Sequence, residues 1–113
     1  MQAFGLRIAS IRFATRGIKT SKRLGVLVTV RDRRGFLVRD AIVSIAGVPG
    51  TRSPIAWRQA AYSNRLGQAT FRLPLEQRMG GKRLLVAITA RTPKVQAHRV
   101  AAVHLPALSA AKA

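Results

Sequence analysis

Residues 24–31 read LGVLVTVR and decide the fold, because their apolar side chains recur at every second position. The even-numbered residues are all leucine or valine, whereas Gly25, Thr29 and Arg31 are not apolar side chains. This is the period of a β-strand with one buried face. We therefore expect a strand here, with its even-numbered side chains in the core.

The same period returns in residues 41–45 (AIVSI), 68–73 (QATFRL) and 83–91 (RLLVAITAR), so each predicts a further strand. Residues 95–105 predict a last strand whose core face is either its odd-numbered or its even-numbered side chains. In the strands at 41–45, 68–73 and 83–91, the residues expected to face the core are Ala41, Val43, Ile45, Ala69, Phe71, Leu73, Leu84, Val86, Ile88 and Ala90.

Glycine and proline mark the connections between these strands. Residues 31–35 suit a tight turn in which Gly35 adopts positive φ and Asp32 bonds local amides. Asn64–Gly67 is expected to join the two strands of a hairpin, with its glycine at the position that needs a permissive backbone. The segment 47–54 holds two glycines and two prolines, which predicts a surface loop.

The opening segment allows two interpretations. Leu6 and Ile8 share one face of an extended chain, whereas Ile11 and Phe13 share the other. A strand here therefore needs a bulge or a switch of sheet near residues 9–10. A helix is the alternative, because several of these apolar residues also fit helical spacing.

The composition limits the chemistry that the chain can perform. Its 113 residues are 48% hydrophobic, enough for one domain with a stable core. There are 21 Lys+Arg but only 3 Asp+Glu, so the formal charge is +18. Sites that need clustered carboxylates, such as glycosidase pairs or calcium loops, are nearly excluded. The chain has no cysteine, which excludes disulfides and thiol nucleophiles. We expect no cofactor.

Four motifs stand in a characteristic order. V-x-V-x-D-x-x-G spans Val28–Gly35 and V-x-x-A-x-V-x-I spans Val38–Ile45, followed by S-N-x-x-G-x-A-x-F-x-L over Ser63–Leu73 and L-x-V-x-I-x-A over Leu84–Ala90. This order resembles the bacterial Ig-like domains of the invasin and intimin group and the related carboxypeptidase-regulatory-like and transthyretin-like modules. The resemblance covers residues 24–91 and rests on residues that build the fold.

The resemblance and the strand spacing together predict an all-β, Ig-like antiparallel Greek-key β-sandwich of about seven strands. We expect residues 1–106 to form this single domain and residues 107–113 to be a frayed tail. The resemblance implies a non-catalytic structural or adhesive module of a secreted or cell-surface protein. The chain departs from the family in its strong positive charge and in a longer loop over residues 47–61, which carries Trp57.

Arginine clusters at the two predicted turns. Arg31, Arg33, Arg34 and Arg39 lie in or just after the first, and Arg65 lies in the second. The guanidinium group is a planar fork that matches phosphate, sulfate and carboxylate. If the two turns meet at one end of the sandwich, these five residues are a polyanion-binding site. The alternative is that the charge only solvates the surface.

Other candidate residues have weaker support. His98 and His104, six residues apart on a strand, lie too far apart to bind one metal ion. Ser44 and Ser63 lack the histidine and orienting acid that a serine nucleophile needs. Trp57 either stacks on a sugar or nucleobase or caps the end of the core. We therefore expect neither a metal site nor an enzyme.

The expected partner is an anionic polymer, either a cell-wall polymer, an acidic polysaccharide or a nucleic acid, and neighbouring domains or subunits are further candidates. No membrane span is expected, because no run approaches the roughly 18 apolar residues that one requires. We expect an extracellular or cell-surface location; Arg7 and Arg12 interrupt the first segment, so this location requires a processed form or a piece of a longer protein. The alternative is a cytoplasmic protein that binds nucleic acid without sequence preference.

Overall fold

The computed structural model describes residues 5–14, 23–48, 58–75, 81 and 83–105, which form seven strands and no helix. Within these ranges there is accordingly no helical segment that could cross a membrane. The strands are β1 (Leu6–Ala14), β2 (Arg23–Asp32), β3 (Ile42–Gly47), β4 (Arg58–Tyr62), β5 (Gln68–Pro74), β6 (Arg83–Arg91) and β7 (Gln96–His104).

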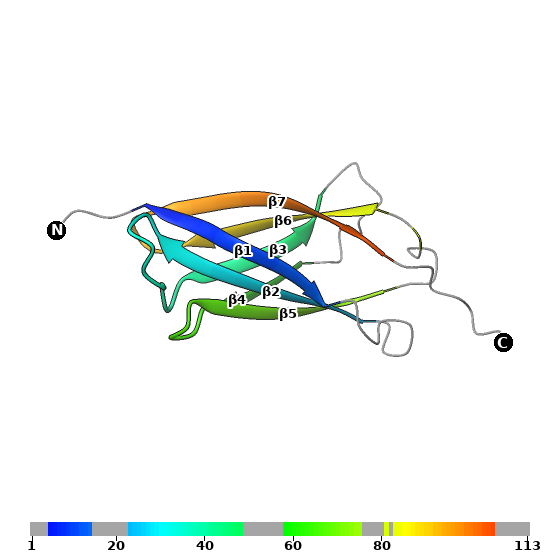
Figure 1. Cartoon of the computed structure of the whole chain (residues 1–113), viewed down its shortest axis with the longest axis horizontal. Helices are drawn as coiled ribbons and strands as arrows, with labels where there is room; N and C mark the ends of the chain where they lie inside the picture. The colour runs from blue at the N-terminus through cyan, green and yellow to red at the C-terminus, as the bar shows by residue number, and fades with distance from the viewer. Residues whose placement is uncertain (1–4, 15–22, 49–57, 76–80, 82, 106–113) are drawn as a thin grey trace.

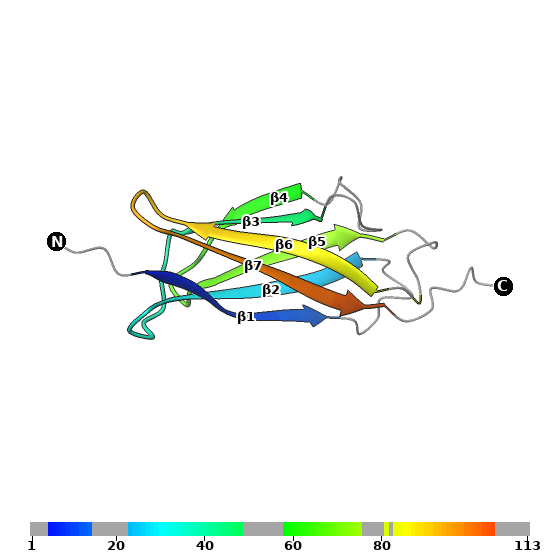
Figure 2. The same ribbon diagram turned by 90° about the horizontal axis from the view of Figure 1, so that it is seen from above.

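The strands form two antiparallel sheets that pack face to face (Figures 1 and 2). One sheet has the order β1-β2-β5 and the other the order β4-β3-β6-β7. The chain crosses from one sheet to the other after β2, β4 and β5, so both sheets contain strands from both halves of the sequence. The prediction of an all-β antiparallel sandwich of about seven strands is confirmed.

The core lies between the sheets and is built by the period-two pattern. The even-numbered side chains of β2 and β6 are all buried, and the odd-numbered ones of β3 and β5 complete the layer. Each strand therefore buries one face, as the alternation predicts. The predicted core residues are confirmed, and the core also includes Ile8, Leu75, Val103 and Leu105.

Strand β1 contains the bulge that its mixed pattern predicts. Ile8 pairs with Val30 and Ile11 pairs with Val28, with a register shift between Ile8 and Ser10. The extra residue lets Ile8 and Ile11 both contact the core although their spacing is odd. The bulged strand is confirmed, and the helical alternative is wrong.

Strand β7 directs its odd-numbered side chains toward the core. Val103 is buried, and Ala97 and Ala101 pack against the core. Arg99 belongs to the same face, and its Nη1 donates a hydrogen bond to the carbonyl oxygen of Ile8 at 3.1 Å. A charged side chain is tolerated here because β7 is an edge strand beside β1, so Arg99 remains exposed.

The prediction of a hairpin around Asn64–Gly67 is wrong. Strand β4 pairs with β3, whereas β5 pairs with β2, so this turn passes the chain between sheets. Its chemistry is as predicted: Asn64 Oδ1 accepts from the amides of Leu66 and Gln68, and Gly67 has a φ of 70°. The same turn residues occur in hairpins and in connections between sheets, so the sequence did not distinguish the two.

Two boundaries also differ from prediction. The expected loop over residues 47–61 ends at Arg58, where β4 begins, because its consecutive alanines conceal a strand that alternates only weakly. Gly47 belongs to β3 and not to the loop. The predictions for Trp57, for most of the loop at 47–54 and for the tail at 107–113 fall outside the described residues.

Candidate polyanion-binding site

Both arginine-bearing connections lie at the same end of the sandwich (Figure 1). The amide of Val30, in β2, donates a hydrogen bond to the carbonyl oxygen of Gly67 at 2.7 Å. Gly67 also lies against the side chain of Leu37, in the β2–β3 connection. The structure thus brings the turn of Arg65 beside the connection that carries the other four arginines, as a shared site requires.

A hydroxyl group anchors this junction from within. Ser63 is buried, donates a hydrogen bond from Oγ to the carbonyl oxygen of Val38 at 2.7 Å and accepts one from the Ala41 amide at 3.0 Å. Its carbonyl oxygen accepts from the amide of Asp40 at 2.8 Å. Ser63 therefore ties the end of β4 to the β2–β3 connection.

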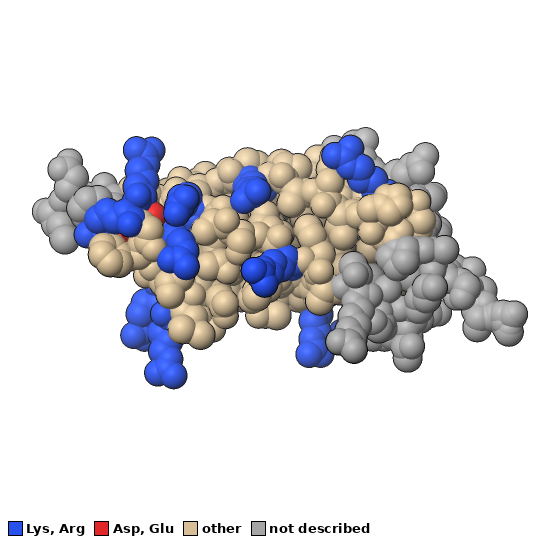
Figure 3. All heavy atoms as spheres, in the orientation of Figure 1, with Lys and Arg blue, Asp and Glu red and all other residues tan. Residues whose placement is uncertain are grey.

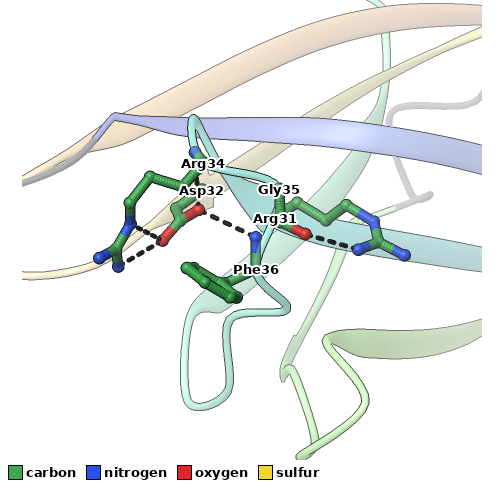
Figure 4. A network of polar contacts seen from close by, with 5 residues as sticks. All are labelled: Arg31, Asp32, Arg34, Gly35 and Phe36. Atoms are coloured by element: carbon green, nitrogen blue, oxygen red, sulfur yellow. Dashed lines mark hydrogen bonds and ion pairs between the residues drawn. The ribbon is translucent and has the colours of Figure 1, made fainter.

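Asp32 organises the turn that follows β2 (Figure 4). Its Oδ1 accepts from the backbone amides of Arg34 and Phe36 at 2.9 and 3.0 Å. Its Oδ2 accepts from Nε and Nη2 of Arg34 at 3.1 and 2.8 Å. The Arg34 guanidinium also lies 4.9 Å from the centre of the Phe36 ring, within cation–π range. Arg34 is thus part of the turn's own structure.

These contacts govern the protonation of Asp32. Desolvation by burial acts to raise the pKa of this carboxyl group. The hydrogen bond from Arg34, the backbone amides of Phe36 and Arg34, and the Arg34 charge together outweigh it, so the pKa of Asp32 lies below its usual value. The carboxylate therefore remains ionised and neutralises one charge of the cluster at neutral pH.

Arg31 and Arg39 each have a partner as well. Nη1 of Arg31 donates to the carbonyl oxygen of Gly35 at 2.6 Å, closing the turn from the other side (Figure 4). Nε of Arg39 lies 3.4 Å from Oδ2 of Asp40, but both side chains are more than 70% exposed. An exposed pair of this kind is worth at most about 1 kcal/mol. Arg39 can therefore exchange Asp40 for another anion.

Arg33 and Arg65 are exposed at the tips of their turns. The amide of Arg33 donates to the carbonyl oxygen of Gly5 at 3.0 Å, and its side chain passes close to the Gly5 backbone. Arg65 projects from the Asn64–Gly67 turn. Arg33, Arg39 and Arg65 are thus the three members of the predicted site that are available to an incoming anion.

This end of the sandwich retains a positive charge after these pairings. Its five predicted arginines face two aspartates, Asp32 and Asp40, which leaves a net charge of +3. On the face seen in Figure 3, basic side chains are densest at this end and scattered elsewhere. We name Arg33, Arg39 and Arg65, together with the supporting Arg31 and Arg34, the basic end.

A second feature at this end escaped the sequence reasoning. A cavity of about 640 Å³ opens on the outer face of the β4-β3-β6-β7 sheet. Its lining includes Asp40, Tyr62, Arg91, Lys94 and Gln96. These residues are distant in sequence, and only the strand register brings them together, so no local motif could have identified them.

The remaining candidates from sequence lie apart from one another. His98 and His104 are both exposed on β7, and Thr89 Oγ1 lies 3.2 Å from Nδ1 of His98. Among the described residues, no three histidine, aspartate or glutamate side chains gather where a metal ion could bind.

Comparison with known proteins found no relative. No protein-family model matches the chain, and neither the curated proteins nor the solved structures contain a match. The fold by itself defines an all-β sandwich with a basic end.

Proposed function

We propose that this chain is a non-catalytic, Ig-like structural and adhesive module of a secreted or cell-surface protein, and that its basic end associates with anionic polymers. The observation that carries the proposal is the meeting of two arginine-bearing connections, with Arg33, Arg39 and Arg65 exposed. Guanidinium groups recognise phosphate, sulfate and carboxylate with matched geometry.

The locality of the charge matters more than its total. At physiological ionic strength, interactions between exposed charges are screened beyond about 8 Å. Most of the +18 charge therefore acts only in its immediate neighbourhood. A polymer with repeated anionic groups can contact several neighbouring arginines at once, which a single small anion cannot do.

The path of the chain supports a role as one module among others. Strand β1 begins at the basic end, and β7 ends at the opposite end of the long axis (Figures 1 and 2). A chain that traverses its domain in this way can be linked in series with neighbouring domains.

The test is the salt dependence of binding to duplex DNA, for the parent and the triple variant R33Q/R39Q/R65Q. If the variant loses about three phosphate contacts, the slope of log affinity against log salt becomes shallower by about 2 to 3. We leave Arg31 and Arg34 unchanged, since their hydrogen bonds shape the turn.

The matched control is R58Q/R72Q/R83Q, which removes the same charge from exposed positions on β4, β5 and β6. These positions lie toward the opposite end of the sandwich. We expect the control to retain nearly the parental slope. Equal slopes for the two triple variants would remove the basic end as the binding site, leaving the charge as a solvated surface.

The competing function is non-specific nucleic-acid binding in the cytoplasm. Binding of DNA in vitro suits both functions, so the decisive observation is made in native cells. The surface module predicts protein in the envelope or medium without bound nucleic acid. Cytoplasmic protein that co-purifies with nucleic acid would favour the competing function.

A further inference from the structure

One row of side chains crosses the whole outer face of the four-stranded sheet at the basic end. The register pairs Tyr62 with Ile42, Ile42 with Arg91, and Arg91 with Gln96. Neighbouring strands are about 4.8 Å apart, so Tyr62 and Arg91 originate about 10 Å apart. An aromatic ring, a cation and an amide thus follow one another on one surface.

This row forms the floor of the cavity of about 640 Å³. The next row toward the middle of the sheet begins with Ala60 and Ser44, whose small side chains leave the Tyr62 ring uncovered. Tyr62 is 68% exposed. The ring is therefore available for stacking from the open side of the cavity.

The wall of the cavity is a hydrogen-bonded turn between β6 and β7. The Thr92 amide donates to the carbonyl oxygen of Val95 at 2.8 Å, and the Val95 amide donates to Thr92 Oγ1 at 3.2 Å. Proline at residue 93 fixes its own φ within this turn. Lys94 is therefore presented on a constrained loop, beside Arg91, and both line the cavity.

We propose that this cavity binds an acidic polysaccharide, with Tyr62 stacking on a pyranose ring and with Arg91 and Lys94 pairing with uronate carboxylates. The proposal rests on the anionic-polymer association proposed above and assigns it a ligand class and a further site. A ligand that contacts both Tyr62 and Arg91 must extend across the strands, as an oligosaccharide does.

Asp40 favours a sugar over a nucleic acid. Asp40 lines the cavity, and a carboxylate only accepts hydrogen bonds. Every residue of an acidic polysaccharide carries hydroxyl groups that can donate to it, whereas the phosphodiester backbone of DNA has no donor. The Asp40 amide is held by the carbonyl oxygen of Ser63 at 2.8 Å, which fixes the backbone beside the end of β4. Gln96 adds both a donor and an acceptor for hydroxyl groups.

The test measures affinity for an oligogalacturonate by titration calorimetry near physiological salt, with a neutral oligosaccharide and a single-stranded DNA as comparison ligands. Tyr62→Ala and Arg91→Gln should each weaken oligogalacturonate binding about tenfold, the usual loss for one stacking platform or one charged hydrogen bond. Tyr62→Phe should retain binding, because the ring is preserved.

Two controls separate the site from general effects. Arg83→Gln removes the same charge from the far end of β6, on the same outer face, and Val100→Ala trims an exposed apolar side chain outside the cavity. Both should change affinity less than about twofold. Equal losses for Arg83→Gln and Arg91→Gln would overturn the proposal, as would loss of DNA binding alone in Tyr62→Ala.

The outcome also separates this proposal from the one on which it rests. If the parent binds duplex DNA with the expected salt slope but ignores the oligogalacturonate, the cavity proposal is wrong while the basic end stands. If the parent binds neither polymer, both proposals fail.

Discussion

The backbone of Gly67 joins the two connections at the basic end. Its φ is 70°, and a Cβ added there would lie 2.7 Å from the carbonyl oxygen of Val30. Gly81 has nearly the same φ, 71°, but no residue that the structure describes lies within 4 Å of an added Cβ. The two glycines thus share a conformation and differ only in surroundings.

This comparison gives a matched prediction. Gly81→Ala should cost about 1 to 2 kcal/mol, the strain of a left-handed residue that carries a Cβ. Gly67→Ala should cost clearly more, because the clash with the Val30 carbonyl is added to the same strain. Urea unfolding of both variants measures the difference, and equal losses would mean that the turn can move away from β2.

Asp32 gives a pH-dependent prediction. Its pKa is lowered on folding, so its contribution to stability is fully present above the unfolded value of 3.8 and is lost as pH falls through the lower folded pKa. Asp32→Asn should therefore be less stable than the parent at neutral pH, and the difference should shrink below about pH 4.

The chain suits this measurement because it has only 3 Asp+Glu in all. Few other carboxyl groups can contribute to an acid transition, so most of the parent's acid sensitivity should disappear in Asp32→Asn. Unfolding midpoints in denaturant, measured across the acid range, test this. A constant difference between parent and variant at every pH would contradict the assigned role.

At the scale of the element, the alternating pattern of the central strand β2 predicts which substitutions destabilise the fold. Val28 is fully buried, whereas Leu27, its neighbour, lies half-buried on the outer face of the sheet. Val28→Ala should cost about 1 to 3 kcal/mol through lost burial and a cavity. Leu27→Ala should cost less although it removes more atoms. Equal losses in thermal unfolding would mean that a further layer covers the outer face.

The strands that were predicted correctly are those whose environment is simple. In β2, β3, β5 and β6 one face meets the core and the other does not, so alternation alone locates them. Strand β4 was not predicted, because its neighbouring residues Ala60 and Ala61 are both alanine and hide the alternation between the two faces.

Pairing was harder to predict than strand position. The Asn64–Gly67 turn has the residues of a hairpin, yet the partners of β4 and β5 are decided by strands distant in sequence. The core face of β7 was equally undecided, because Arg99 lies on the inward side. The structure resolves it: Arg99 remains exposed on the edge strand β7 and donates a hydrogen bond to the Ile8 carbonyl oxygen.

At the scale of the whole molecule, the prediction of the site was also limited by contacts between residues that are distant in sequence. The five arginines could be named from sequence, but their partners could not: Asp32 engages Arg34, and Asp40 lies beside Arg39. Arg33, Arg65 and Arg39, whose pair with Asp40 is exposed to solvent, therefore remain available to an incoming anion. The row of Tyr62 and Arg91 depends on register across three strands, which no local pattern encodes.

The most direct test of the basic end maps the bound polymer onto the chain. We would titrate the ¹⁵N-labelled protein with a short heparin oligosaccharide and record amide chemical shifts near physiological salt. The account predicts that the shifts concentrate at this end of the sandwich, in residues 33–39 and 64–67 and, through the cavity, in residues 91–96, with little change around Arg58, Arg72 and Arg83. Shifts of equal size at both ends of the sandwich, or none at all, would contradict it.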